Sequence, residues 1–168
     1  MTRWRMIGQG AGFSLPELVI VLAIVAIVML VGVPGMINLN RDAKLSAQTD
    51  QIVALLSMAR QEAIKQRRAF VVCPATTPDT ATACSTSASD WSSGILVMDG
   101  NTVFRRMPIS SDVTLTYAQT TINFAGTLGS VAAAATINLC SPGRYQQQIA
   151  VTVSGRAAKR VNTGTRCT

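Results

Sequence analysis

The segment from residue 13 to residue 33 limits what this chain can fold into. Only Ser14, Pro16 and Glu17 in this run of 21 residues are clearly neither apolar nor small. As a helix the run would extend about 31 Å, close to the thickness of a bilayer hydrocarbon core. Arg3 and Arg5 precede it and supply the positive flank that stays in the cytoplasm. The sequence therefore predicts one membrane-spanning helix.

The small residues near this apolar run precede it, whereas those of a secretory signal follow the apolar stretch. A cleaved signal carries its small-residue cleavage site after the apolar stretch. Here the glycines and alanine of residues 8–12 come before it, and no such site follows residue 33. We therefore expect the apolar segment to be retained in the mature protein.

A second helical pattern follows, over residues 38–68. Polar and charged residues, Gln48 among them, are predicted to lie on the face opposite an apolar stripe at helical spacing, which indicates an amphipathic helix packed on a sheet. Joined to the segment 13–37, it forms one helix of about 55 residues, in which Pro34 removes a backbone donor and is expected to cause a kink. The predicted buried stripe consists of Leu45, Ile52, Leu56, Ala59 and Ala63.

Residues 69–168 change to alternating, β-branched patterns typical of strands. A polar loop (74–90) interrupts them, and Asp99-Gly100-Asn101 is a hairpin signal. The predicted fold class is α+β, with a long N-terminal helix on a small antiparallel β domain. The candidate strands are 69–73, 94–99, 102–107, 113–117, 121–124, 136–140 and 148–153, whereas 129–135 reads as a weak strand or a loop.

The four cysteines are expected to form two disulfides if the segment after the apolar run is exported. None lies in a Cys-x-x-Cys pair and the chain has no histidine, which excludes a Cys/His zinc site. Sequence order favours pairing Cys73 with Cys84 and Cys140 with Cys167. Four cysteines permit three pairings, so the sequence leaves the connectivity open.

Charge is unevenly distributed. The formal charge is +7, and no acidic residue follows Asp112. The segment 141–168 is therefore a basic tail, suited to an anionic partner or, equally, a solvated or subunit-contacting loop. If Cys167 is tied to Cys140, the tail closes into a loop or hairpin that could bridge successive phosphates. Its candidate DNA-binding residues are Arg144, Arg156, Lys159, Arg160 and Arg166.

Catalysis has little support in the sequence. Without histidine there is no Ser-His or Cys-His pair, and the eight acidic residues stand singly. No nucleotide-binding glycine motif follows a strand. We expect no catalytic residue, no metal site and no cofactor.

Gly12, followed by Phe13-Ser14-Leu15-Pro16-Glu17 and an apolar helix, resembles a class III prepilin signal of the type IV pilin and type II secretion pseudopilin superfamily. The resemblance implies that residues 1–12 are a leader, that a membrane prepilin peptidase cuts between Gly12 and Phe13, and that Phe13 is N-methylated. Pro34 then falls at mature position 22, where pilins often carry a proline.

The resemblance also gives Glu17 a role. An acid at the membrane boundary is tolerated if it acquires a cation. In pilins this glutamate is thought to pair with the N-terminal amine of the neighbouring subunit and so to fix axial register. The alternative is a carboxylate that caps the helix N-terminus.

The segments 57–72, 91–99, 122–129, 137–140 and 149–156 narrow the resemblance to FimT/FimU-type minor pilins and GspH-type minor pseudopilins. In FimT-type pilins of competent bacteria a Gly-Arg-x-Arg motif is associated with DNA binding. This chain keeps Gly155-Arg156 but has its next basic pair at Lys159-Arg160. The expectation is a minor pilin of the tip or initiation complex that binds double-stranded DNA, without sequence specificity, for natural transformation.

The implied partners are major and minor pilins, the prepilin peptidase and the inner membrane. The implied location is the bacterial inner membrane, crossed once with the β domain in the periplasm, and the extracellular pilus. A GspH-type pseudopilin of a type II secretion system is the alternative, and an assembly primer without ligand is a third.

Overall fold

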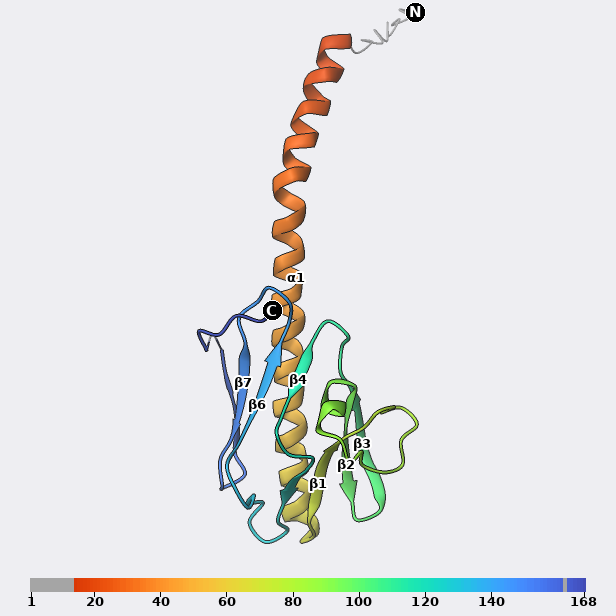
Figure 1. Ribbon diagram of the computed structural model, residues 1–168, viewed down its shortest axis with the longest axis vertical. Helices are drawn as coiled ribbons and strands as arrows, with labels where there is room; N and C mark the ends of the chain where they lie inside the picture. The colour runs from red at the N-terminus through yellow and green to blue at the C-terminus, as the bar shows by residue number, and fades with distance from the viewer. Residues whose placement is uncertain (1–13, 162) are drawn as a thin grey trace, which may run out of the picture. The chain divides into compact units, whose positions relative to one another are not determined.

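The fold is described from a computed structural model that defines residues 14–161 and 163–168, with residues 31–34 defined in their backbone only. Helix α1 (Leu15–Gln66) is followed by eight strands and the short helix η1 (Ala88–Ser92) (Figure 1). The chain divides into two compact units, residues 1–38 and residues 39–168. Each unit is described by itself.

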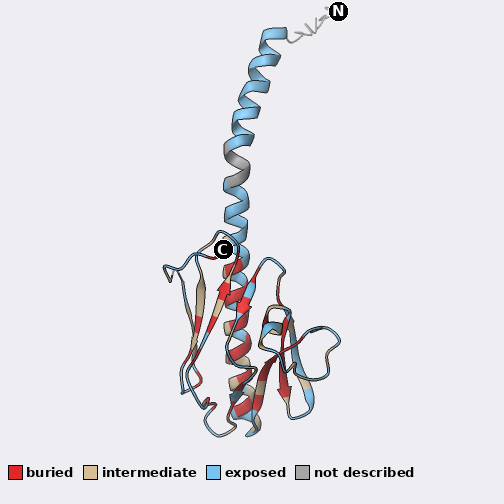
Figure 2. Ribbon diagram, in the orientation of Figure 1, coloured by how far each residue is buried: buried red, intermediate tan, exposed pale blue. Residues whose placement is uncertain are grey.

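The described part of the first unit is the N-terminal portion of α1, which begins with Glu17 in its first turn. Its large apolar side chains are all exposed, and its most apolar 18-residue window has a mean hydropathy of 3.0 (Figure 2). By length and composition it can cross a membrane. The backbone stays helical through Pro34, and the kink there remains a prediction.

Two four-stranded antiparallel sheets form most of the second unit. The first has the order β3-β2-β1-β5 and the second β4-β6-β7-β8. The first comprises β1 (Phe70–Pro74), β2 (Gly94–Asp99), β3 (Thr102–Pro108) and β5 (Ile122–Phe124). The second comprises β4 (Thr114–Thr116), β6 (Ala135–Cys140), β7 (Gln147–Val151) and β8 (Ala157–Arg160). The α+β fold class is confirmed, and all seven predicted strands are present.

The sequence did not predict β8, and residues 129–134 prove to be a loop. Strand β8 contains two alanines, a lysine and an arginine, none of which favours a strand by itself. Its conformation comes from pairing with β7, in the register Gln148↔Arg160 to Val151↔Ala157. A tight turn closes the hairpin, where the Thr152 amide donates to the Arg156 carbonyl.

One hydrophobic core joins the C-terminal half of α1 to both sheets (Figure 2). The predicted stripe is confirmed, because all five of its residues are at most 1% exposed. The prediction that Gln48 lies on the polar face is wrong. Its side chain is buried, and its Oε1 accepts a hydrogen bond from the Ser110 amide. This bond compensates the burial of the amide oxygen.

Two disulfides hold the loops of the second unit. Cys73 at the end of β1 is bonded to Cys84 in the polar loop, and Cys140 at the end of β6 to Cys167. This is the pairing that sequence order favours. The second bond fixes the end of the chain beside the sheet that contains β8.

Candidate nucleic-acid interface

Strand β8 determines where the basic tail presents its charges. Side chains of a strand alternate between the two faces of its sheet. Lys159 is paired with the fully buried Ile149, whereas Arg160 is paired with Gln148. Lys159 therefore lies on the face that covers α1, and its sequence neighbour Arg160 lies on the outer face.

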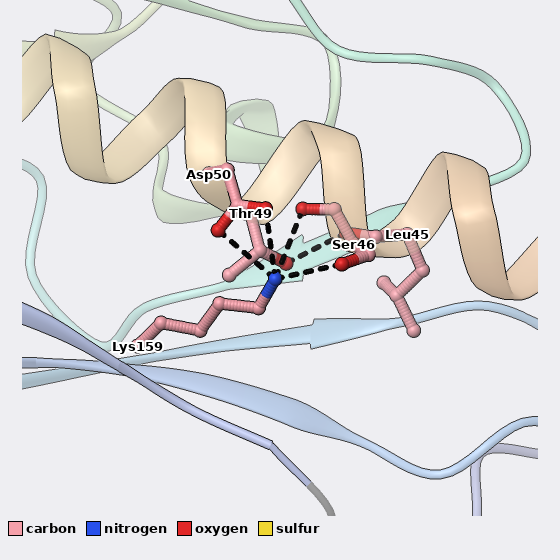
Figure 3. A network of polar contacts seen from close by, with 5 residues as sticks. All are labelled: Leu45, Ser46, Thr49, Asp50 and Lys159. Atoms are coloured by element: carbon pink, nitrogen blue, oxygen red, sulfur yellow. Dashed lines mark hydrogen bonds and ion pairs between the residues drawn. The ribbon is translucent and has the colours of Figure 1, made fainter.

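Lys159 is engaged by the helix. Its Nζ donates to both carboxylate oxygens of Asp50, at 2.9 and 3.0 Å, and to Oγ of Ser46 at 2.7 Å (Figure 3). Only 19% of its side chain is exposed. The ammonium already has a carboxylate partner and cannot leave it for a phosphate without cost.

Arg144 is engaged in the same way. Its Nε and Nη2 both donate to the carboxylate of Asp42, which makes a two-pronged ion pair. Lys44 of the helix contacts Asp112, which precedes β4, at 2.6 Å. These three pairs, Asp42–Arg144, Lys44–Asp112 and Asp50–Lys159, join α1 to the second sheet and are called the helix clamp below.

The other three predicted cations, Arg156, Arg160 and Arg166, are exposed. No carboxylate in the described part of the chain forms an ion pair with them. Arg156 immediately precedes β8 and Arg160 is its last residue, so that they stand about 13 Å apart along the extended chain. The guanidinium of Arg166 lies 5.4 Å from the ring centroid of Tyr145. We call these three side chains the outer arginines.

The five predicted DNA-binding residues thus divide into two groups with different surroundings. The three outer arginines can reach a polyanion, whereas Arg144 and Lys159 are bound to α1. Sequence reasoning missed their partners, Asp42 and Asp50. A signal was present, since residues eight apart on a helix lie on one face and this pair flanks the buried Leu45.

Gly155 has a structural role that the sequence concealed. Its φ is +78°, and a Cβ at this position would overlap the carbonyl oxygen of Gly129. The hairpin between β7 and β8 therefore reaches the loop before β6 only because residue 155 has no side chain. The glycine of the Gly155-Arg156 pair is thus required by packing.

The predicted N-terminal sites are described only in part. Gly12 and Phe13 lie outside the described residues, and of Pro34 only the backbone is defined. Glu17 is exposed in the first turn of α1, near the positive end of the helix dipole. No group of three or more potential metal-ligating side chains occurs among the described residues.

Two aspartates outside the tail predict an acid-labile domain. A hydrogen bond from Lys44, with the charge of Lys44, lowers the pKa of Asp112, and hydrogen bonds from Ser85 and Thr76 lower that of Asp90. Because these folded-state pKa values lie below the unfolded ones, their stabilisation is complete above about pH 4 and is lost as the pH falls through them. We expect the melting temperature, measured by circular dichroism, to decrease when the pH is lowered below about 4.

The control for this prediction is the pair of variants Asp112→Asn and Asp90→Asn. Each should melt a few degrees lower at pH 7 and should lose less between pH 5 and pH 3 than the parent protein does. A parallel acid loss in all three proteins would contradict the assignment to these carboxylates.

Comparison with known proteins agrees with this architecture. Residues 48–156 match the protein family described as type II transport protein GspH. The chain belongs to the GspH family. The match begins in the second half of α1 and ends at Arg156. The region that defines the GspH family therefore leaves out the apolar helix start, β8 and the end of the tail.

Two solved structures have the same fold as this GspH-family chain. Both are crystal structures of the type IV minor pilin FimU of Pseudomonas aeruginosa (strain PAO1), in space groups P21 and P65. They align with TM-scores of 0.57 and 0.54, each at 17% identity, over 73% and 70% of this chain and 92% and 94% of FimU. A search of curated proteins finds no match. The pilin-like fold is thereby confirmed.

Proposed function

We propose that this protein is a minor type IV pilin, anchored in the bacterial inner membrane with its β domain in the periplasm and assembled into the pilus tip or initiation complex. The FimU-like fold carries the proposal. Membership of the GspH family and the exposed apolar start of α1 support it. Its partners would be other pilins and the prepilin peptidase, which would cleave between Gly12 and Phe13.

Glu17 has the position that the assembly role requires. It follows Phe13 by four residues in the sequence, and the freed amine of Phe13 would carry a positive charge after cleavage. In lipid, a carboxylate is tolerated when an opposite charge accompanies it. Pairing with the amine of an adjacent subunit would therefore favour the assembled filament over the single subunit in the membrane.

We expect Glu17→Ala to be processed and inserted normally but to enter filaments at less than a tenth of the parental level. The reason is the loss of the charge that pairs between subunits. Immunoblots of sheared filaments and of the membrane fraction measure both quantities. Glu62→Ala, at an acid in the last turns of α1, is the control and should assemble normally. Incorporation of Glu17→Ala at the parental level would contradict the role.

DNA binding is the second part of the proposal, and the outer arginines would carry it. Their charges are exposed, no carboxylate of the described residues forms an ion pair with them, and the roughly 13 Å between Arg156 and Arg160 is comparable to the width of the DNA major groove, about 12 Å. Tyr145 is the one exposed aromatic residue nearby, and Arg166 covers it. The surface therefore suits phosphates of a duplex and offers little for reading bases.

The salt dependence of binding tests this part. Three phosphate contacts predict a slope of about −2.7 for log K against log salt concentration. Replacing Arg156, Arg160 and Arg166 together by glutamine should bring the slope close to zero and weaken binding at least tenfold at low salt. Fluorescence anisotropy of a labelled duplex with the full chain in detergent gives both numbers.

Two controls separate this surface from general charge. Lys159→Gln should lower the melting temperature, because it breaks the helix clamp, and should change the slope by less than one. Arg105→Gln with Arg106→Gln, on the other sheet, should leave the slope nearly unchanged. An unaltered slope in the triple variant would rule out the tail as the binding surface.

A minor pseudopilin of a type II secretion system is the second candidate. The description of the matched family favours it, because that family is named for type II transport. Strand β8 and the tail after it lie beyond the matched region, and the exposed basic residues there favour the pilin. Deletion of the gene separates the two, since loss of surface pili with normal protein secretion supports the pilin and the reverse supports the pseudopilin.

A further inference from the structure

A groove of about 590 Å³ runs between α1 and β3, on the sheet that lacks the outer arginines. Its floor is apolar, with the buried Leu55 and the half-buried Met58 from the helix and Met107 from the strand. Methionine side chains adapt to the shape of what they contact. The groove lies entirely within the second unit, and nothing in the described chain fills it.

The strand beside the groove is a free edge. β3 pairs with β2 on one side, and the described strands provide no partner on the other. Its register shifts opposite Val97 and Met98, so that Phe104 is the extra residue of a bulge. Beyond the bulge, residues 105–108 border the groove. An exposed edge is a ready template for another extended chain.

Two arginines of β3, Arg105 and Arg106, line this groove, and they project from opposite faces of the sheet. Arg105 is opposite Val97 and Met107 is opposite Ile95, and both partners belong to the main core. Arg105 therefore shares the helix-facing side of the sheet with Met107. Arg106 lies on the other side and donates to the Ala81 carbonyl of the polar loop. In the described chain, no carboxylate forms an ion pair with Arg105.

We propose that this groove receives an extended acidic and apolar segment of another subunit, which adds to the free edge of β3 and pairs a carboxylate with Arg105. The edge supplies backbone hydrogen bonds, the methionine floor takes alternate apolar side chains, and the charge of Arg105 selects an acid. A nucleic acid would use the charge alone and would leave both the floor and the edge unsatisfied. The inference goes beyond the proposed function, because it does not depend on DNA binding.

A designed peptide tests the proposal with the full chain in lipid nanodiscs. The probe is a labelled nine-residue peptide that has valine at every second position and either threonine or glutamate at the positions between. One comparison peptide carries glutamine in place of glutamate, and another carries a central proline, which removes a backbone donor. We expect the glutamate peptide to bind at least fivefold more tightly than the glutamine peptide and the proline peptide not to bind.

Protein variants locate the site. Arg105→Glu and Met58→Lys should each weaken binding of the glutamate peptide at least fivefold, whereas Arg160→Glu, a matched charge reversal on the other sheet, should change it less than twofold. If Arg105→Glu does not fold, the glutamate and glutamine peptides still test the charge with the parent protein.

Other outcomes overturn the proposal. Equal binding of the three peptides would contradict both the pairing with the edge of β3 and the role of the charge. Unchanged binding to Arg105→Glu would contradict the pairing of a carboxylate with Arg105. Self-association of the full chain that Arg105→Glu abolishes would make a second copy the occupant. Displacement of the peptide by duplex DNA, at concentrations that saturate the outer arginines, would assign the groove to nucleic acid.

Discussion

Gly155→Ala is expected to lower the free energy of unfolding by about 3 kcal/mol, through backbone strain and overpacking together. The residue has a φ of +78°, a backbone angle that residues with a Cβ adopt only at a cost in free energy. The new methyl group would also overlap the carbonyl oxygen of Gly129. Relief requires the β7–β8 hairpin to move away from the loop before β6, which displaces Arg156. Urea denaturation with an unchanged m-value measures the loss.

Gly143→Ala is the matched control. Its φ is +76°, nearly that of Gly155, but a Cβ there would meet no atom within 4 Å. It should therefore cost only the conformational strain, about 1 kcal/mol. If the two variants lost the same stability, the close approach to Gly129 would carry no energy. The comparison also tests whether packing against Gly129 is enough to explain the glycine of the Gly155-Arg156 pair.

Helix periodicity made the core predictable from the sequence. The five residues of the predicted stripe follow the helical repeat, and all five are buried. The repeat works because every position on that face meets the same sheet surface. Gln48 departs from it for a local reason, since its amide oxygen accepts a hydrogen bond from the Ser110 amide in a loop 62 residues away. Such a partner cannot be read from spacing.

The functional surface was only partly predictable for a related reason. Charge composition located the tail, but the division between Lys159 and Arg160 depends on β8 being a strand and on its register with β7. No residue of β8 favours a strand by itself, so the sequence did not indicate that Lys159 and Arg160 lie on opposite faces of a sheet. Once the register is known, the inward lysine needs a carboxylate, and Asp50 meets it. Long-range pairing, which local propensity cannot show, decides which charges face outward.

Removing the disulfide between Cys140 and Cys167 is expected to cost roughly 3.5 kcal/mol, from the loop entropy of its 27-residue separation. The bond also fixes the end of the tail, where the Cys167 amide donates to the Arg144 carbonyl and Tyr145 forms an isolated bridge with Arg166. In Cys140→Ser with Cys167→Ser, the tail should therefore detach. Arg166 would lose its fixed place, and the salt slope of DNA binding should decrease in magnitude by about one.

The disulfide between Cys73 and Cys84 provides the control, because it closes a shorter loop, with a separation of 11, and is attached to the first sheet, whereas β8 belongs to the second. Its removal should cost roughly 2.8 kcal/mol by the same relation and leave the salt slope unchanged. Denaturation curves and duplex anisotropy on both double variants measure stability and charge placement separately. A slope that responded equally to both variants would mean that loss of stability, and not release of Arg166, weakens binding. A slope that responded to neither would remove Arg166 from the DNA surface and leave Arg156 and Arg160 as its cations.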